Sequence, residues 1–327
     1  MKLQVKVVRL FFFIIFNLLN KKQILHTYFN TTLYSMKRHF TFLIILLGTL
    51  NTINFYGNTN YKFKHFNINN GLSQNTVYDI LQDKQGFMWF GTKDGLNRFD
   101  GTSFKVFKFS PEGILTDNVF RRIIQDKNEK LWVATDDGVY IFNPYMEEFT
   151  RFNYITDEGH SVGGFISDMV VDNDGDIWIA VNGKGIFHYN FAEDNLDFYS
   201  LHMEDKEMKM ITLCVDNDNC IWVFPYSAPF LVIDKKTKKI KDFQLVDNNT
   251  LMLYAGEITD VLADQYNRLI ITTSQKGVIR VNTVNRTHQI LLDKDVNGEQ
   301  IFARSVEIAD KQTLWIGTES GIYIYHS

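Results

Sequence analysis

Residues Ile80 to Asp100 read ILQDKQGFMWFGTKDGLNRFD and contain the pattern on which the fold prediction rests. It combines an aspartate, an aromatic residue six positions later, a glycine and a final apolar run. The same order returns from Ile124 to Asn143 as IQDKNEKLWVATDDGVYIFN, and from Val170 to Asn190 as VVDNDGDIWIAVNGKGIFHYN. Further copies begin near Cys214, Leu262 and Ile308. A repeated unit, rather than a single catalytic motif, therefore dominates this sequence.

The repeat has a regular period. Its structural anchors are Trp89, Trp132, Trp178, Trp222, Ile270 and Trp315, and successive anchors are 43, 46, 44, 48 and 45 residues apart. The aspartate precedes the anchor by six residues in the first five copies and by five in the last. A period of this length, with short β-type segments, is typical of a propeller blade.

The second copy divides into four expected strands, at residues 120–125, 131–135, 139–142 and 148–153. Asp126 suits the first turn because an aspartate can bond its own backbone two residues on. Gly138 suits the hairpin because it supplies the positive φ that a tight turn demands. Four strands per unit make a propeller blade, so we predict an all-β fold, a β-propeller of four-stranded blades with six repeats visible.

Composition limits the class of protein. The chain has 327 residues, of which 45% are hydrophobic and 15% aromatic, enough for a large core. A net charge of −4 offers no basic field for nucleic acid. The basic run at 235–239 is interpreted as a solvated hairpin turn, with a partner-binding patch as the alternative. Cys214 and Cys220 are expected to be free thiols in a strand pair, with a disulfide as the alternative.

Two apolar segments precede the repeats, at residues 7–19 and 40–50. The second follows Met36, Lys37 and Arg38, which is the layout of a signal peptide, and both are short for a transmembrane helix. We expect residues 1–35 to be an upstream extension, with a membrane anchor at 7–19 as the alternative. Residues 36–57 are expected to be a signal peptide, and residues 58–327 the exported propeller.

The repeat resembles the two-component regulator propeller of Bacteroides-type hybrid histidine kinases. The resemblance covers about residues 61–326. It is carried by GLSQNTV at 71–77, MWFGT at 88–92 with DGL at 94–96, LWVAT at 131–135 with Gly138, and LWIGT at 314–318 with Gly321 and Ile322. It implies a periplasmic sensor that binds carbohydrate breakdown products and signals across the membrane. Its implied partners are an oligosaccharide, a second copy of the chain and, in full-length relatives, a membrane-linked kinase module.

The chain departs from this family in length, because relatives carry a second propeller, a membrane helix and a kinase. This sequence has none of the kinase motifs and stops after the third strand of the sixth copy. The strand-like piece Tyr61–Asn67, which resembles 103–109, could complete a six-bladed ring. Alternatively the gene is truncated and the intact ring has seven blades, which the family lengths favour.

Function is expected where the copies disagree, because binding residues usually lie on variable loops. The long link from Tyr154 to Phe165 contains Tyr154 and His160. The fourth copy loses its glycine and reads VFPYSAPF from Val223, where Tyr226 could stack on a sugar ring, although a drifted hairpin is the blander interpretation. Tyr154, His160 and Tyr226 are therefore the candidate ligand contacts.

Three motifs are set aside. Gly159–Gly163 fits G-x-S-x-G but lies between β repeats, without the helix that this nucleophile motif needs. Asp172–Asp176 resembles the start of a calcium loop, but position twelve is Gly183, so a turn is the interpretation and a weak calcium site the alternative. Gly183–Gly185 is a hairpin rather than a phosphate loop. We expect no catalytic residues, metal ligands or cofactor.

The sequence therefore predicts a non-enzymatic, exported sensor module. Two alternatives stay open: a propeller enzyme such as a glycan lyase or hydrolase, and a protein-interaction scaffold without a small ligand. The enzyme would need clustered histidines, arginines or carboxylates on the loop face, and no such repeated set is evident.

Overall fold

A computed structural model describes residues 61–108, 113–203, 206–207, 209–226, 228–235, 237–246 and 258–326. The chain divides into two compact units, residues 1–64 and 65–327. The described part of the first unit, Tyr61–Lys64, has no helix or strand. The expected upstream extension and signal peptide lie outside the described residues, so both stay predictions. No helix in the described part of the chain is long and apolar enough to cross a membrane.

The second unit is almost entirely β-structure, apart from the short 3-10 helix η1 (Ile68–Asn70). The first sheet contains β1 (Val77–Gln82), β2 (Met88–Thr92), β3 (Gly95–Phe99) and β4 (Phe104–Phe107). The second contains β5 (Arg122–Gln125), β6 (Leu131–Ala134), β7 (Val139–Asn143) and β8 (Glu148–Arg151). The third contains β9 (Ile166–Val171), β10 (Ile177–Val181), β11 (Gly185–Asn190) and β12 (Asn195–Ser200).

The remaining sheets follow the same plan. The fourth contains β15 (Thr212–Val215), β16 (Ile221–Phe224), β17 (Phe230–Asp234) and β18 (Lys239–Phe243). The fifth contains β19 (Ile258–Ala263), β20 (Arg268–Thr273), β21 (Gly277–Asn282) and β22 (Thr287–Leu292). The sixth contains β23 (Ala303–Asp310), β24 (Thr313–Thr318) and β25 (Gly321–His326). A small ribbon, β13 (His202–Met203) with β14 (Lys206–Glu207), precedes the fourth sheet.

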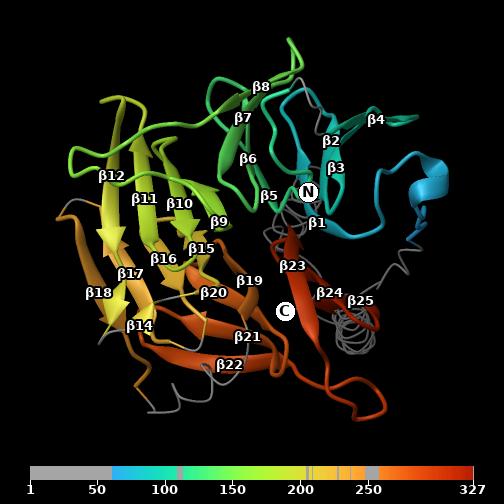
Figure 1. The fold of residues 1–327 in the computed structure, drawn as a ribbon. Coiled ribbons are helices and arrows are strands. Elements are labelled where there is room, and N and C mark those ends of the chain that lie inside the picture. The colour runs from blue at the N-terminus through green and yellow to red at the C-terminus, as the bar shows by residue number, and fades with distance from the viewer. Residues whose placement is uncertain are drawn as a thin grey trace, which may run out of the picture. The chain divides into compact units, whose positions relative to one another are not determined.

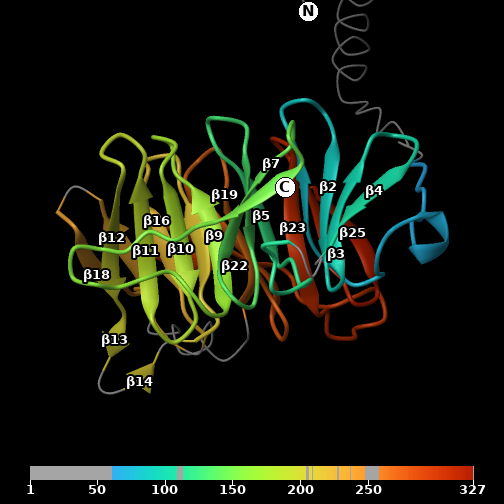
Figure 2. The same ribbon diagram turned by 45° about the horizontal axis from the view of Figure 1, so that its top comes forward.

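Each sheet is an antiparallel meander in which the strands pair in chain order. The six sheets form a ring, and the first strand of each lies nearest the centre (Figures 1 and 2). The prediction of a six-repeat β-propeller is therefore confirmed. The strand boundaries expected for the second copy agree with β5 to β8 within about two residues.

Hydrogen bonds explain why the aspartate lies six residues before the tryptophan. In the first four copies, one carboxylate oxygen of the aspartate accepts the indole N–H of the anchor tryptophan. The Oδ2···Nε1 distances are 2.7 Å for Asp83 and Trp89, 3.0 Å for Asp126 and Trp132, 3.0 Å for Asp172 and Trp178, and 2.8 Å for Asp216 and Trp222. The other oxygen accepts backbone N–H groups of the turn. A six-residue spacing therefore fixes both the turn and the tryptophan.

The fifth copy replaces the tryptophan with Ile270 and keeps the aspartate satisfied by another donor. Arg268 Nε donates to Asp264 Oδ2 over 2.7 Å, in the place of the missing indole. Ile270 remains fully buried among residues of the sixth blade. The expected exchange of a core residue is confirmed, and it is accompanied by a new polar partner for Asp264.

The anchors pack each blade against the next one. Trp89 lies 5.4 Å from the ring of Phe142, and Trp132 lies 5.6 Å from the ring of Tyr189, each in the following blade. Separate buried clusters fill the successive interfaces from the first blade to the sixth. This arrangement suits tryptophan, because one indole buries a large apolar area and carries one N–H that needs an acceptor.

Of the two alternatives for the ring, completion of the sixth blade by an N-terminal strand is wrong. Residues Tyr61–Asn67 form no strand, and within the described residues the sixth sheet has three strands ending at β25. Instead, Phe66 packs edge-on against Phe99 and Phe104 of the first blade, with ring centroids 4.9 and 5.5 Å away. Phe66 therefore packs on the face of the first sheet, and the segment does not pair with a strand at a sheet edge.

Both cysteines are free thiols, as expected. Cys214 is buried in β15, and burial raises its pKa to about 12. A thiol that stays protonated at neutral pH is a poor nucleophile. Cys214 therefore acts as a small apolar core residue.

Candidate functional site

The long link between the second and third blades is folded back on itself as a small hairpin. Ile155 and Ser161 form an isolated β-bridge, and Thr156 N donates to His160 O over 2.8 Å. The Thr156 hydroxyl also accepts the His160 N–H over 3.0 Å. Because Gly159 sits at φ +86°, the chain can reverse within these few residues. The hairpin fixes the position of His160 in particular.

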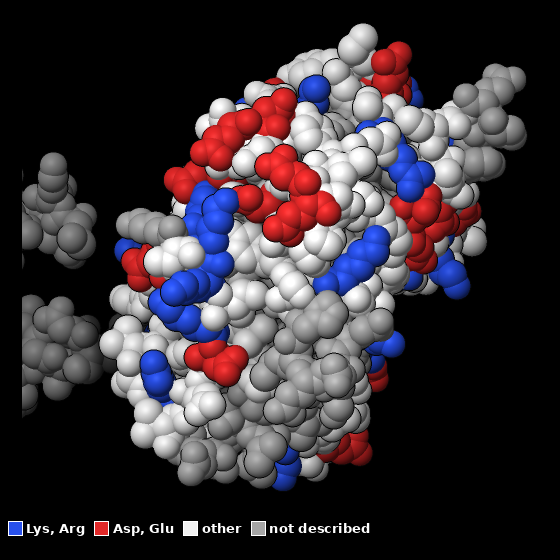
Figure 3. Space-filling model, turned by 60° about the vertical axis from the view of Figure 1, so that its left-hand side comes forward, with Lys and Arg blue, Asp and Glu red and all other residues white. Residues whose placement is uncertain are grey.

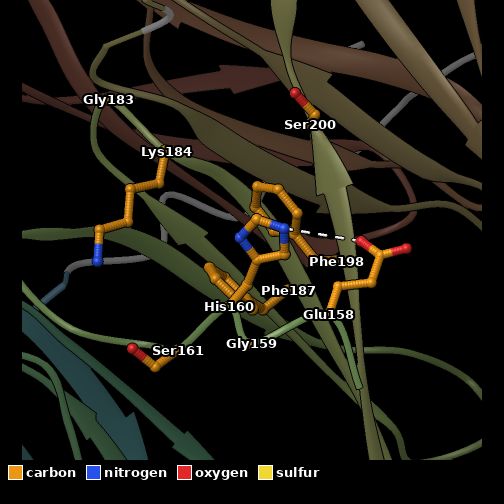
Figure 4. A pocket seen from close by; sticks show the side chains of 9 residues that line it. All are labelled: Glu158, Gly159, His160, Ser161, Gly183, Lys184, Phe187, Phe198 and Ser200. Carbon is orange, nitrogen blue, oxygen red and sulfur yellow. Dashed lines mark ion pairs between the residues drawn. The ribbon is translucent and has the colours of Figure 1, made fainter. Parts of the chain in front are cut away.

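A groove of about 620 Å³ lies between this hairpin and the third blade. Its lining residues are Glu158, Gly159, His160, Ser161, Gly183, Lys184, Phe187, Phe198 and Ser200. The His160 imidazole lies 4.3 Å from the ring of Phe198, with 32° between the planes. Figure 4 shows Lys184 and Glu158 on opposite sides of the His160 ring. Phe187, which is buried, also lines the groove.

The groove joins flat aromatic surface to hydrogen-bonding groups. Phe198 and His160 offer ring faces, while Ser161, Ser200 and Lys184 offer hydroxyl and ammonium groups. Glu158 Oε2 lies 3.6 Å from His160 Nε2. Pockets that hold small polar ligands combine apolar walls with a few placed polar groups in this way. The arrangement can therefore bind a ligand with one apolar face and several hydroxyl groups.

Close backbone approach shapes one wall of the groove. Gly185 begins β11 at φ +146°, and a Cβ atom there would lie 2.4 Å from the carbonyl oxygen of Tyr199. Only glycine fits, so β11 and β12 can approach closely enough to place Phe187 against Phe198, with ring centroids 4.8 Å apart.

Tyr154 lies on the other side of the same hairpin. Its hydroxyl donates to Asp194 Oδ1 over 2.7 Å, and the Tyr189 hydroxyl donates to the same oxygen over 2.6 Å. These two hydrogen bonds lower the pKa of Asp194. Tyr154 lines a separate cavity of about 390 Å³ and is 37% exposed. Its ring is thus held by the third blade and is only partly available to a ligand.

The structure does not bring Tyr226 into the groove. Tyr226 lies in the loop between β16 and β17, is 53% exposed, and its backbone N–H donates to Lys209 O. Of the predicted contacts, Tyr154 and His160 share one loop, and His160 alone lines the groove. The identity of all three as ligand contacts stays a prediction.

Sequence reasoning missed the residues that complete the groove. Phe198, Phe187 and Lys184 belong to the regular strands and hairpin of the third blade, where the pattern predicts core or turn residues. The length of the loop at 154–165 was the one feature of the sequence that pointed to this region. A long loop indicates that it covers part of the surface, but it does not show which residues lie beneath it. Ser161, the serine of the rejected G-x-S-x-G pattern, lies in the hairpin and is followed by no helix.

The centre of the ring holds a second polar group of residues. In the first, third and fifth blades, the first strand carries an aspartate that pairs with the residue two positions after the anchor. These aspartates are Asp79, Asp168 and Asp260. Each lies next to a β-bulge, an extra residue that re-aims the following side chain. Each accepts a backbone N–H from the next blade, at 2.7 Å from Ile123, 2.8 Å from Leu213 and 3.0 Å from Val306. These carboxylates therefore join neighbouring blades.

Arg122, at the same position of the second blade, is the counter-ion of this group. Its guanidinium lies 3.0 Å from Asp168 and 3.5 Å from Asp79. Burial raises the pKa of Asp168 to about 6, although Arg122 opposes the shift. Burial likewise raises the pKa values of Asp79 and Asp260. Asp79, Arg122 and Asp260 also line a cavity of about 800 Å³ at the centre of the ring.

Known proteins share the repeat and the fold of this chain. Residues 71–94 match a family model described as "Two component regulator propeller". Two extracellular domains of B. thetaiotaomicron proteins, both described as hybrid two component systems, are similar in structure. One gives a TM-score of 0.64 at 22% identity, over 77% of this chain and 35% of that chain. The other gives 0.64 at 24%, over 80% of this chain and 35% of that chain.

A virginiamycin B lyase from Staphylococcus aureus is similar too, with a TM-score of 0.57 at 11% identity, over 77% of this chain and 84% of that chain. The chain matches no curated protein sequence. The resemblance to two-component regulator propellers, seen first in the repeat, is confirmed by the family match and the structural likeness. This chain spans about a third of the two B. thetaiotaomicron domains, since it covers 35% of each.

Proposed function

We propose that the propeller is the extracytoplasmic ligand-sensing module of a hybrid two-component system, and that its ligand is an oligosaccharide released from a complex glycan. The observation that carries this proposal is the match of residues 71–94 to the regulator propeller family. The likeness to two extracellular domains of such systems supports it and favours a periplasmic location.

The groove beside His160 is the proposed ligand site. A sugar ring has one apolar face and hydroxyl groups around its edge, so it can stack on the ring pair of His160 and Phe198. Its hydroxyl groups would reach Ser161, Ser200 and Lys184, which line the same groove. Aromatic side chains suit such a role because they give contact area at low conformational cost.

Signal transfer follows from the position of the groove. The covering hairpin joins the second blade to the third, so a ligand that contacts both would change how these blades pack. We propose that this change alters the pairing of two copies and passes to a membrane-linked kinase module. The propeller itself acts by binding and is not an enzyme, although a lyase shares its fold, since fold alone does not decide function.

Replacement of His160 by alanine is expected to lower the affinity for the oligosaccharide about tenfold, a loss of about 1.4 kcal/mol, because a stacking and hydrogen-bonding contact is removed from the ligand. The folded structure should be unaffected, since the His160 side chain is 46% exposed and lies on a surface hairpin. Calorimetric titration of the purified chain with fragments of several complex glycans measures this change.

Tyr226→Ala is the matched comparison, because Tyr226 is an exposed aromatic residue in the other candidate loop. Unchanged affinity is expected for this variant. Loss of binding in Tyr226→Ala but not in His160→Ala would place the site in the fourth blade instead. Turnover of a glycan by the wild-type chain would contradict the non-enzymatic role, and absence of binding to every fragment would favour a protein-interaction scaffold.

A further inference from the structure

The turn before the anchor of the third blade carries more charge than its fold requires. Asp172, Asp174 and Asp176 occupy its first, third and fifth positions. In the other complete turns, the third and fifth positions are Gln85 and Phe87, Asn128 and Lys130, Asp218 and Cys220, and Tyr266 and Arg268. Asp172 alone makes the hydrogen bonds that define the turn and hold Trp178. Asp176 Oδ1 accepts the backbone N–H of Phe191 over 3.1 Å, and Asp174 Oδ2 accepts a side-chain N–H of Asn219 over 2.9 Å. A neutral amide oxygen could accept either bond, so the negative charge of these two carboxylates needs another explanation.

A single ammonium group lies among these three carboxylates. Lys235 extends from the turn between β17 and β18 of the fourth blade across to the third. Its Nζ lies 2.6 Å from Asp172 Oδ2, 2.8 Å from Asp174 Oδ2 and 2.9 Å from Asp176 Oδ2. On the side of the molecule that carries β12 and β18, basic side chains lie directly beside acidic ones (Figure 3). The basic run at 235–239, expected to be a solvated hairpin turn, also contributes Lys235 to an ion pair between blades.

A histidine completes the group. His188 lies on β11 opposite Trp178, stacks on the indole at 4.1 Å, and is 3% exposed. Its Nε2 lies 3.3 Å from Asp176 Oδ2, and its buried Nδ1 has no hydrogen-bond partner. Asp197 Oδ2 lies 3.7 Å from that Nδ1. The same position in the other blades holds Arg98, Ile141, Val232, Arg280 and Ile324.

These residues have the geometry of a metal site. One ligand atom each from Asp172, Asp176 and His188 lies within 4.8 Å of the others, and all three side chains are buried. His188 Nε2 faces the carboxylates, 3.3 Å from Asp176 Oδ2, so it is the nitrogen that would bind the ion. Asp197 stands where a carboxylate orients a metal-bound imidazole through its second nitrogen.

We infer that Asp172, Asp174, Asp176 and His188 form a divalent-cation site, here called the aspartate cage, whose resident cation is the chain's own Lys235 ammonium. The inference is independent of the sensing role, because the cage lies in the turn before Trp178 and not in the groove. Oxygen donors combined with one imidazole nitrogen suit Mn²⁺ better than Ca²⁺, which prefers oxygen ligands alone. A metal ion and Lys235 would exclude one another.

Lys235→Met tests the inference, because methionine keeps the length of the side chain and removes its charge. The variant is expected to bind one Mn²⁺ per chain about 100-fold more tightly than the wild type, since the two buried carboxylates, Asp172 and Asp176, favour any cation strongly when their counter-ion is removed. The free Mn²⁺ signal in electron paramagnetic resonance measures binding. Ca²⁺ is expected to bind this variant more weakly than Mn²⁺.

Lys238→Met is the matched control. Lys238 lies in the same turn and forms a 2.7 Å ion pair with Asp197, but it does not contact the three aspartates. It should bind Mn²⁺ no more tightly than the wild type. Adding Asp174→Asn or His188→Ala to Lys235→Met should reduce the affinity at least about tenfold, as expected when a ligand is lost.

Three results would overturn the inference. They are equal Mn²⁺ affinity in Lys235→Met and Lys238→Met, tight Mn²⁺ binding by the wild type, and full affinity in the Asp174→Asn double variant. If Lys235→Met is partly unfolded, the thermal midpoint is compared with and without Mn²⁺. A higher midpoint with the ion supports the cage, and an unchanged midpoint contradicts it.

Discussion

Trp132→Ala is expected to lower the free energy of unfolding by about 3–5 kcal/mol, as for other large-to-small changes at fully buried aromatic residues. Trp132 is 1% exposed and lies at the interface between the second and third blades. Its indole contacts the rings of Phe152 at 4.8 Å and Tyr189 at 5.6 Å. The change leaves a cavity between two rigid sheets and also removes the donor that satisfies buried Asp126. Denaturant unfolding of the purified chain measures the loss.

Trp132→Phe separates the two contributions. Phenylalanine keeps most of the apolar contact but cannot donate to Asp126, so a smaller loss of about 1–3 kcal/mol is expected from the unsatisfied carboxylate and the reduced volume. A Trp132→Ala variant with an unchanged unfolding midpoint would contradict the role of the tryptophan as the wedge between blades.

Arg122→Met is expected to destabilise the ring through its centre. The guanidinium neutralises Asp79 and Asp168, and methionine leaves both carboxylates without a counter-ion. Loss of one partner of a fully buried ion pair costs about 3–5 kcal/mol. Because the Arg122 side chain is 35% exposed to the central cavity, water screens the remaining charges and about 2–3 kcal/mol is expected at pH 7.

The same variant has a diagnostic dependence on pH. The pKa of Asp168 is raised from its usual 3.8 to about 6 in the folded chain, so the folded state binds the proton more tightly than the unfolded state. This group therefore reduces stability as the pH rises from about 4 to about 6, and its penalty is complete above that range. Without Arg122 the pKa values of Asp79 and Asp168 rise further. The loss of stability in Arg122→Met, relative to the wild type, should therefore be largest at pH 7. It should be smaller at pH 4.5, where the carboxyl groups are protonated.

Arg122→Lys is the control, since it keeps a positive charge near both carboxylates and should retain more of the stability than methionine does. Thermal unfolding midpoints of the three proteins at pH 7 and pH 4.5 test this dependence. An equal deficit of Arg122→Met at both pH values would show that Arg122 acts by packing and not by charge.

The sequence predicted the blades because their pattern is local. An aspartate, an anchor six residues later and a glycine lie within one pair of strands, so spacing alone indicates turn, strand and hairpin. The six-residue spacing is also the distance at which the carboxylate meets the indole N–H, although the sequence indicated only the turn. The sequence indicated that Ile270 replaces the tryptophan in the core. That Arg268 donates to Asp264 in place of the missing indole could be seen only from the position of its side chain.

Predictions that depended on distant residues were less complete. The loop at 154–165 was expected to hold a site, and His160 lines a groove there, but Phe198 and Lys184 come from strands and a turn that look regular in the sequence. The piece at Tyr61–Asn67 alternates like a strand, yet its aromatic residue Phe66 packs on the face of the first sheet instead. Alternating apolar and polar residues indicate that a segment has one apolar side. They do not show which part of the protein that side packs against.

The β-propeller, its repeat and the residues that build each blade could be predicted from the amino-acid sequence, because the pattern of each copy lies within about 20 residues. The contacts between side chains of neighbouring blades are seen only in the folded chain. Arg122 meets Asp79 and Asp168 from neighbouring blades, and Lys235 reaches three carboxylates about 60 residues earlier in the chain. Packing of adjacent blades against one another brings such side chains together, and no local pattern encodes the pairing of charges that lie on different blades.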